Sequence, residues 1–221
     1  CPVRPLGVSG KRLWFLNTID QIDYLDPQYT KSDVLQLFGG RFDYLCWAWP
    51  RFGENGKVSN YANELIVADL IAACKALGSW EPSDKERWQG CWRDNAGNLV
   101  VHCGDTVYLG GRRHPAGEYD GFIYPARPKM MRPWALDDDL PGGFVPLLRS
   151  TLRSWAWARP EVDPHLLLGW IGAAFLGGAL AWRPMIYLTG GAGTGKSSLQ
   201  ALLRAILREW VFHTEDTTRA G

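Results

Sequence analysis

A glycine-rich octapeptide at residues 190–197, with the sequence GGAGTGKS, constrains the fold of this chain more than any other feature. It fits the pattern G-x-x-x-x-G-K-[ST], in which glycines let successive backbone N–H groups approach an anion closely. An apolar run at residues 184–189 precedes it and is typical of a buried parallel strand. Apolar residues at helical spacing follow it over residues 198–208. This order of strand, loop and helix predicts a phosphate-binding loop.

Two residues of the loop have specific expected roles. The ammonium of Lys196 would reach the β- and γ-phosphates, which makes Lys196 the expected catalytic residue. The hydroxyl of Ser197 would complete the ligand shell of a Mg²⁺ ion, which makes Ser197 the expected metal ligand. We therefore expect ATP and Mg²⁺ as cofactors. The predicted nucleotide-binding residues are Gly190, Gly191, Ala192, Gly193, Thr194, Gly195, Lys196, Ser197 and Ser198.

The whole chain of 221 residues predicts an α/β protein in three parts. Residues 1–130 mix strand and helix signals and predict a mixed α+β accessory domain. Residues 131–182 predict an irregular connector and a helical collar, and residues 183–221 the start of a P-loop ATPase domain with a parallel sheet. Because the sequence starts at Cys1 and stops at Gly221 in mid-pattern, we expect it to be a piece of a longer protein, with the C-terminal side of that sheet missing.

Local signals place the elements of the first 130 residues. Two apolar runs between residues 13 and 25 flank a turn at residues 17–20 and predict a hairpin. A capping box at residues 30–33 predicts a short helix through Phe38, and a longer helix is expected at residues 60–77 with Ile66, Leu70, Ala73 and Leu77 on one face. Further strands are expected at residues 88–92, 99–102, 106–109 and 121–124.

The C-terminal part predicts helices at residues 144–158 and 166–182, then a helix after the loop and a second strand at residues 210–213. The segment 166–182 has 17 residues without a charge, at the short limit for a membrane span, and four glycines lower its hydrophobicity. A buried helix beneath the nucleotide domain is the favoured interpretation. We expect no membrane partner.

The net charge is only +1, so charge does not indicate whether the partner is a nucleic acid. Basic residues gather at 112–113, at 127–132 and at 149–159, where they would form either a phosphate-facing stripe or ordinary solvated faces. The tryptophan pairs at 47–49 and 155–157 would either stack on bases or pack in the core, and the core is favoured. Three adjacent carboxylates at 137–139 predict a solvated loop rather than a cation site.

The five cysteines include no C-x-x-C pair, which favours a reducing compartment over a disulfide framework. A zinc site built from Cys91, His102, Cys103 and His114 would follow no familiar ligand spacing, so buried thiols are favoured. Residues 214–218 are expected to cap a helix, with a direct role in nucleotide or DNA binding as the alternative.

Residues 183–198 resemble the ATPase region of phage and prophage replication proteins, the primase–helicase group allied to superfamily 3 and AAA+ helicases. The predicted collar before them and residues 214–221 after them extend the likeness. Residues 37–40 and 92–105 resemble stretches of phage-type proteins more weakly.

The resemblance implies a ring-forming, hexameric ATPase that translocates on single-stranded or forked DNA in the cytoplasm of a bacterial host. It assigns Lys196 and Ser197 to the phosphate and Mg²⁺ positions, and the collar to subunit assembly. The acidic strand, the polar sensor and the arginine of a neighbouring subunit would follow residue 221. Without them we expect the chain to bind ATP poorly and to hydrolyse it hardly at all, because phosphoryl transfer depends on a positioned metal and on charge stabilisation.

Two other classes stay open. One is a signalling or defence ATPase, whose bound nucleotide would control oligomerisation without movement on DNA. The other is a small-molecule kinase, which needs a lid and an acceptor pocket for which the sequence has no signal. An accessory domain of 130 residues makes the kinase the least favoured.

Overall fold

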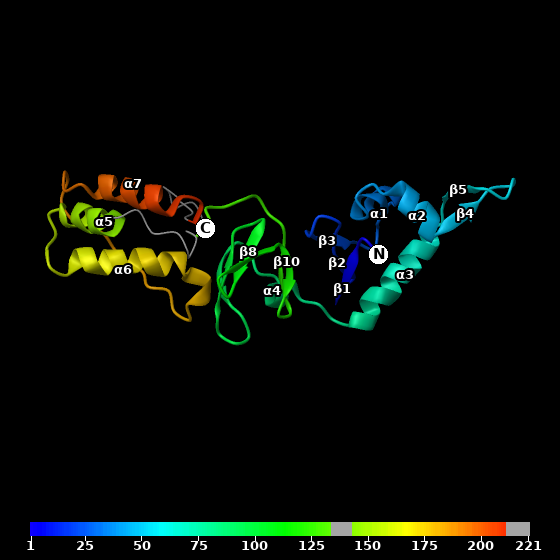
Figure 1. Cartoon of the computed structure of the whole chain (residues 1–221), viewed down its shortest axis with the longest axis horizontal. Helices are drawn as coiled ribbons and strands as arrows, with labels where there is room; N and C mark the ends of the chain where they lie inside the picture. Colours follow the sequence, from blue (N-terminus) through cyan, green and yellow to red (C-terminus); the bar gives the residue numbers. More distant parts are fainter. Residues whose placement is uncertain (134–142, 211–221) are drawn as a thin grey trace. The chain divides into compact units, whose positions relative to one another are not determined.

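The structure, a computed structural model, describes residues 1–133 and 143–210. The carboxylates at 137–139, all but the first residue of the strand expected at 210–213, and the segment 214–218 lie outside the described residues. The described chain is mixed α+β, and its sheets are antiparallel (Figure 1). It divides into two compact units, Cys1–Trp88 with Ala116–Arg127, and Gln89–Pro115 with the described residues from Pro128 onward. The three-part division at residues 130 and 182 stays a prediction.

The first unit begins with an antiparallel sheet of β1 (Arg4–Ser9), β2 (Arg12–Leu16) and β3 (Ile22–Leu25), in that order. The hairpin expected between residues 13 and 25 is confirmed as β2 and β3. Its turn is held by the side chain of Asn17, whose Oδ1 accepts hydrogen bonds from the backbone N–H groups of Ile19 and Gln21.

The expected capping box is confirmed at α1 (Lys31–Leu37): Thr30 accepts from the N–H of Asp33, and the Asp33 carboxylate accepts from the N–H of Thr30. The next elements, which the sequence did not predict, are α2 (Phe42–Ala48) and the hairpin of β4 (Pro50–Phe52) and β5 (Val58–Tyr61). The helix expected from residue 60 is α3 (Asn63–Leu77), which begins later because residues 58–61 pair with β4.

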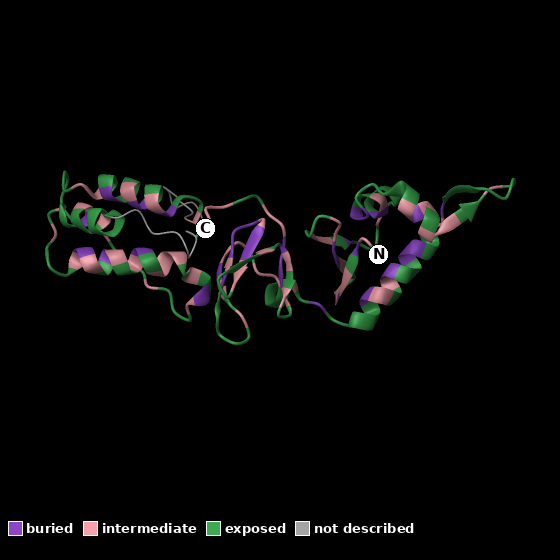
Figure 2. Ribbon diagram, viewed as in Figure 1, coloured by how far each residue is buried: buried purple, intermediate pink, exposed green. Residues whose placement is uncertain are grey.

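One face of α3 supplies much of the core of the first unit, as the buried residues along this helix in Figure 2 show. Ile66 and Leu70 lie there as expected, with Cys74 beside them. Leu77 does not: its side chain is 57% exposed, because it lies in the last turn of the helix before Gly78. The unit is completed by α4 (Pro82–Lys85) and the hairpin of β10 (Gly117–Tyr119) and β11 (Phe122–Tyr124).

The second unit contains a four-stranded antiparallel meander. Its strands are β6 (Gly90–Arg93), β7 (Leu99–His102), β8 (Thr106–Leu109) and β9 (Arg112–Pro115), paired in chain order. The expected strands at 99–102 and 106–109 are confirmed in full, the one at 88–92 is shifted, and β9 was not predicted.

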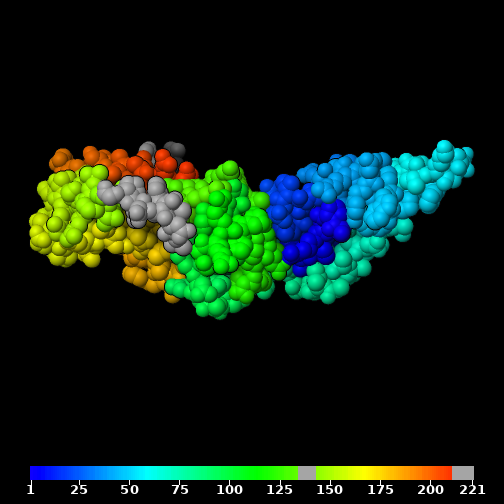
Figure 3. Space-filling view, viewed as in Figure 1, coloured from blue at the N-terminus to red at the C-terminus, as the bar shows by residue number. Residues whose placement is uncertain are grey.

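The second unit also contains three helices that lie side by side (Figure 1): α5 (Phe144–Arg153), α6 (Asp163–Phe175) and α7 (Lys196–Leu207). Short 3₁₀ turns, η1 (Gly177–Ala179) and η2 (Arg208–Trp210), follow α6 and α7. In the space-filling view the atoms of the three helices, coloured from yellow-green to red, lie against one another (Figure 3). Their core consists of Leu152, Leu167, Ile171, Leu199, Leu203 and Leu207.

Two helix boundaries differ from expectation. α5 ends at Arg153 rather than near residue 158. At this end the hydroxyl of Ser154 donates to the carbonyl of Thr151. α6 begins at Asp163, because Pro164 is tolerated in the first helical turn, and it ends before the glycines at 177 and 178. Within the described residues, no helix is both long and apolar enough to cross a membrane.

The parallel strand expected at residues 184–189 is not present in the structure. The segment is neither helix nor strand, because no described strand lies beside it to accept or donate the ladder hydrogen bonds. Ile186 and Leu188 pack against the helical core, whereas Met185 and Tyr187 are 78% and 84% exposed. The alternation of a strand is therefore present without its pairing.

Candidate functional site

The glycine-rich loop leads directly into α7. Gly195 is the N-cap of this helix, with a φ of 82°, and its carbonyl accepts the first helical hydrogen bond from the N–H of Leu199 at 2.9 Å. The first N–H groups of a helix have no partner within it, and the helix dipole places partial positive charge there. The start of α7 therefore has the polarity that binds an anion.

The side chain of Lys196 folds back over the loop. Its Nζ donates to the carbonyl oxygens of Gly190 and Gly191, each at 2.7 Å. The hydroxyl of Thr194 donates to the same Gly191 carbonyl at 2.9 Å. An ammonium group has three N–H donors, so two of them fix its position and the third can serve a phosphate oxygen.

Trp155, in the linker between α5 and α6, supports the loop from the side. Its Nε1 donates to the carbonyl of Gly195 at 3.0 Å. A Cβ at position 195 would lie 2.9 Å from this nitrogen, so only glycine leaves room for the indole. The sequence singled out the tryptophans of this segment but favoured a purely core role, and nothing in the spacing indicated a bond between residues 40 positions apart.

α7 is anchored by an apolar face rather than by the loop alone. Leu199, Leu203 and Leu207 are buried against residues of α5 and α6, and the exposed residues lie on the opposite side of the helix (Figure 2). This spacing of four residues is the one that the sequence indicated. A helix fixed in this way keeps its N-terminus, and therefore Lys196, in one place.

A cavity of about 590 Å³ opens beside the loop. One side is formed by the loop and the segment before it, and the other by the linker between α5 and α6 and the first turns of α6. The volume falls within the usual range for small-molecule sites of about 300–1,000 Å³. Its lining includes Trp155, Trp157, Arg159, Tyr187, Gly190 and Lys196.

The predicted site residues therefore divide into two groups. Gly190, Thr194 and Lys196 line the cavity, while Gly195 caps the helix beside it. The remaining ones are exposed along the loop and the first turn of α7: Gly191, Ala192, Gly193, Ser197 and Ser198. The sequence did not predict the opposite wall, because Trp157, Arg159 and Asp163 are brought to the loop only by the packing of α5 and α6.

The basic clusters, for which the sequence left a phosphate-facing stripe and solvated faces open, are paired in part with carboxylates. Arg127 pairs with Glu86, Arg153 with Glu161, and Arg159 with Asp163. Lys129 and Arg132 both approach the carboxylate of Asp105. This pattern favours the alternative of solvated faces, while Arg112 and Arg113 of β9 are exposed.

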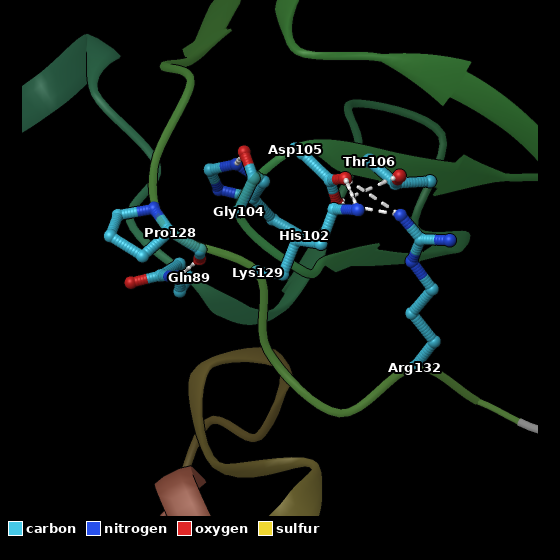
Figure 4. A network of polar contacts seen from close by, with 8 residues as sticks. All are labelled: Gln89, His102, Gly104, Asp105, Thr106, Pro128, Lys129 and Arg132. Carbon is cyan, nitrogen blue, oxygen red and sulfur yellow. Dashed lines mark hydrogen bonds and ion pairs between the residues drawn. The ribbon is translucent and has the colours of Figure 1, made fainter.

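Asp105 is the centre of a polar cluster at the turn between β7 and β8 (Figure 4). Nη2 of Arg132 lies 2.9 Å from Oδ1 and 2.7 Å from Oδ2 of Asp105, and the hydroxyl of Thr106 donates to Oδ1. These contacts, led by the bond from Arg132, hold the pKa of Asp105 below its ordinary value. His102 is buried beside this turn, with Nε2 3.1 Å from the carbonyl oxygen of Gly104.

The cysteines of this region are buried thiols. Burial raises the pKa of Cys91 to about 11, and the proximity of Cys103 adds to the rise. A thiol with such a pKa stays protonated at neutral pH. Within the described ranges, no three His, Cys, Asp or Glu side chains are grouped as metal ligands.

Comparison of the chain with protein-family models, with curated proteins and with solved structures finds no match.

Proposed function

We propose that this chain binds a nucleoside triphosphate at residues 190–197 and belongs to an ATP-dependent DNA helicase or translocase. The observation that carries the nucleotide part is the junction of the loop with α7. Gly195 caps the helix, Lys196 is held over the loop by two carbonyls, and a cavity of nucleotide size lies alongside.

This arrangement offers donors for a triphosphate. The N-terminal N–H groups of α7 would bind the α- and β-phosphates, and the ammonium of Lys196 would bind the β- and γ-phosphates. Ser197, exposed at the first turn of α7, would supply the hydroxyl for Mg²⁺. ATP with Mg²⁺ is therefore the proposed cofactor pair, and the ion would neutralise charge that develops on the phosphates.

The role on DNA is supported by the resemblance of residues 183–198 to phage-type primase–helicases. In that role, a ring of subunits, expected to be a hexamer, would couple hydrolysis to movement along single-stranded or forked DNA. The helices α5 and α6 would form the collar through which the subunits assemble. The alternative is a nucleotide-controlled switch that does not act on DNA.

The test is steady-state ATP hydrolysis by the full-length protein, with and without single-stranded DNA, beside a Lys196→Ala variant. A translocase predicts hydrolysis that rises several-fold with DNA and is lost in the variant. Lys196-dependent hydrolysis that DNA does not change would contradict the role on DNA and favour the switch. Absence of any Lys196-dependent binding or hydrolysis would contradict the nucleotide site itself.

A further inference from the structure

The cavity beside the loop joins two chemically different surfaces. Gly190, Thr194 and Lys196 line it at the glycine-rich loop, and the linker between α5 and α6 supplies Trp155 and Trp157. Tyr187, with 84% of its side chain exposed, adds a third ring. A ligand that fills this cavity has an anionic end for the loop and a flat, apolar part for the rings.

The strongest donors of the aromatic wall are already used within the protein. Nε1 of Trp155 donates to the carbonyl of Gly195, and Nε1 of Trp157 donates to the carbonyl of Leu152 at 2.6 Å. The guanidinium of Arg159 is engaged by Asp163, with Nε 2.9 Å from Oδ1. The two indoles therefore offer no N–H donor to the cavity, and the guanidinium of Arg159, whose side chain is 66% exposed, is not a buried donor.

We propose that this wall binds the base of the nucleotide by stacking, so that the site selects purine over pyrimidine nucleoside triphosphates and discriminates little between adenine and guanine. Stacking scales with the area of the π-system, and it is tolerant of base identity because every base has a π-face. Discrimination between adenine and guanine requires buried groups that pair with their different edges. The inference rests on the proposed nucleotide site and adds its specificity.

Trp157 is the best residue for a test, because its indole N–H is bonded to Leu152 rather than to the loop. Trp157→Phe keeps a smaller aromatic ring and loses that hydrogen bond, whereas Trp157→Ala loses the ring altogether. Tyr187→Ala is a second probe, because an exposed side chain can be removed with little effect on folding. Trp182→Ala is the matched control: Trp182 is 76% exposed in the same unit and does not line the cavity.

The experiment is calorimetric titration of the full-length protein and these variants with ATP, GTP, CTP, UTP and inorganic tripolyphosphate, which has no base. We expect ATP and GTP to bind within about threefold of each other and the pyrimidine nucleotides about tenfold more weakly. Trp157→Ala should weaken ATP and GTP about tenfold and leave tripolyphosphate unchanged. Trp157→Phe should weaken ATP and GTP less than Trp157→Ala does, Tyr187→Ala should weaken ATP and GTP but leave tripolyphosphate unchanged, and Trp182→Ala should change nothing.

Three results would overturn the inference while leaving the phosphate site intact. These are a preference of more than about tenfold between ATP and GTP, equal binding of purine and pyrimidine nucleotides, and loss of tripolyphosphate binding that matches the loss of ATP binding in Trp157→Ala. If no ligand binds in a Lys196-dependent manner, the proposed nucleotide site is wrong and the inference falls with it. The Lys196→Ala titrations separate these two kinds of failure.

Discussion

Two separate constraints, backbone conformation and packing, favour glycine at position 195. Its φ of 82° is strained for any residue with a Cβ, and a Cβ there would also meet the indole of Trp155. Gly193 has a similar φ of 79° but no atom within 4 Å of the added Cβ, so it isolates the backbone effect.

We predict that Gly193→Ala lowers the free energy of unfolding of the second unit by about 1–2 kcal/mol, the cost of a left-handed conformation. Gly195→Ala should lower it further, because Trp155 must also shift and its bond to the Gly195 carbonyl weakens. Chemical denaturation followed by tryptophan fluorescence measures both. Equal losses in the two variants would show that Trp155 does not support the loop.

The carboxylate of Asp105 should make the free energy of unfolding depend on pH. Its pKa in the folded chain lies below the ordinary value, chiefly because Arg132 donates to its carboxylate. A carboxyl whose folded pKa is depressed stabilises the fold fully above the unfolded pKa of about 4, and this contribution is lost as the pH falls through the folded pKa.

Asp105→Asn should therefore destabilise the protein at neutral pH and reduce the loss of stability below about pH 4. Arg132→Lys keeps the charge but loses the guanidinium that lies against both carboxylate oxygens, so it should have a smaller effect of the same kind. Unfolding measured from pH 7 downward tests both variants. An Asp105→Asn curve parallel to that of the unchanged protein would contradict the assignment.

At the scale of elements, α5, α6 and α7 hold the loop in place through a small apolar core. Leu152 of α5 is completely buried in it, whereas Leu147 of the same helix is 65% exposed. The two leucines therefore form a matched pair in which only burial differs.

We predict that Leu152→Ala destabilises the helical core by about 2–5 kcal/mol and also weakens nucleotide binding, because the N-terminus of α7 loses its support. Leu147→Ala should change stability by less than about 0.5 kcal/mol. Urea denaturation and ATP titration of both variants test this. If Leu152→Ala is destabilised but still folded and its nucleotide affinity is unchanged, then nucleotide binding at the loop does not depend on the helical core, and the prediction is wrong.

The sequence predicted the elements whose signals are local. The capping box at Thr30, the Asn17 turn, β7, β8 and the apolar face of α7 all follow from residues within a few positions of one another. The loop also follows a local pattern. Missed elements such as β1 and the hairpin of β4 and β5 have turn dipeptides, Ser9-Gly10 and Asn55-Gly56, but their strands lack a long apolar alternation and pack against α2 and α3.

The wall opposite the loop was unpredictable for a different reason. Trp155 bonds to Gly195, 40 residues along the chain, and no spacing in the sequence records that contact, whereas the bond of Trp157 to Leu152 is local. The parallel strand expected at 184–189 shows a different limit of prediction from sequence. The segment has the alternating exposure of a strand, but a strand also needs a hydrogen-bonded neighbour, and no described strand lies beside it.

For the whole molecule, two activities are proposed together: nucleotide binding at the loop and work on DNA. The proposal of nucleotide binding is argued from the junction of the loop with α7 and from the cavity alongside. The role on DNA rests on the resemblance of residues 183–198 alone. Several basic residues that could form a DNA-facing stripe are paired with carboxylates, whereas Arg112 and Arg113 are exposed.

Nucleotide binding is tested most directly by the affinity of the full-length protein for ATP with Mg²⁺, measured beside that of Lys196→Ala. We predict saturable binding that weakens at least about tenfold in the variant, because Lys196 would supply the charge that binds the phosphates. Circular dichroism of the variant checks that its fold is kept. Equal ATP binding by the two proteins, or none by either, would contradict the assignment of residues 190–197 as a phosphate-binding loop.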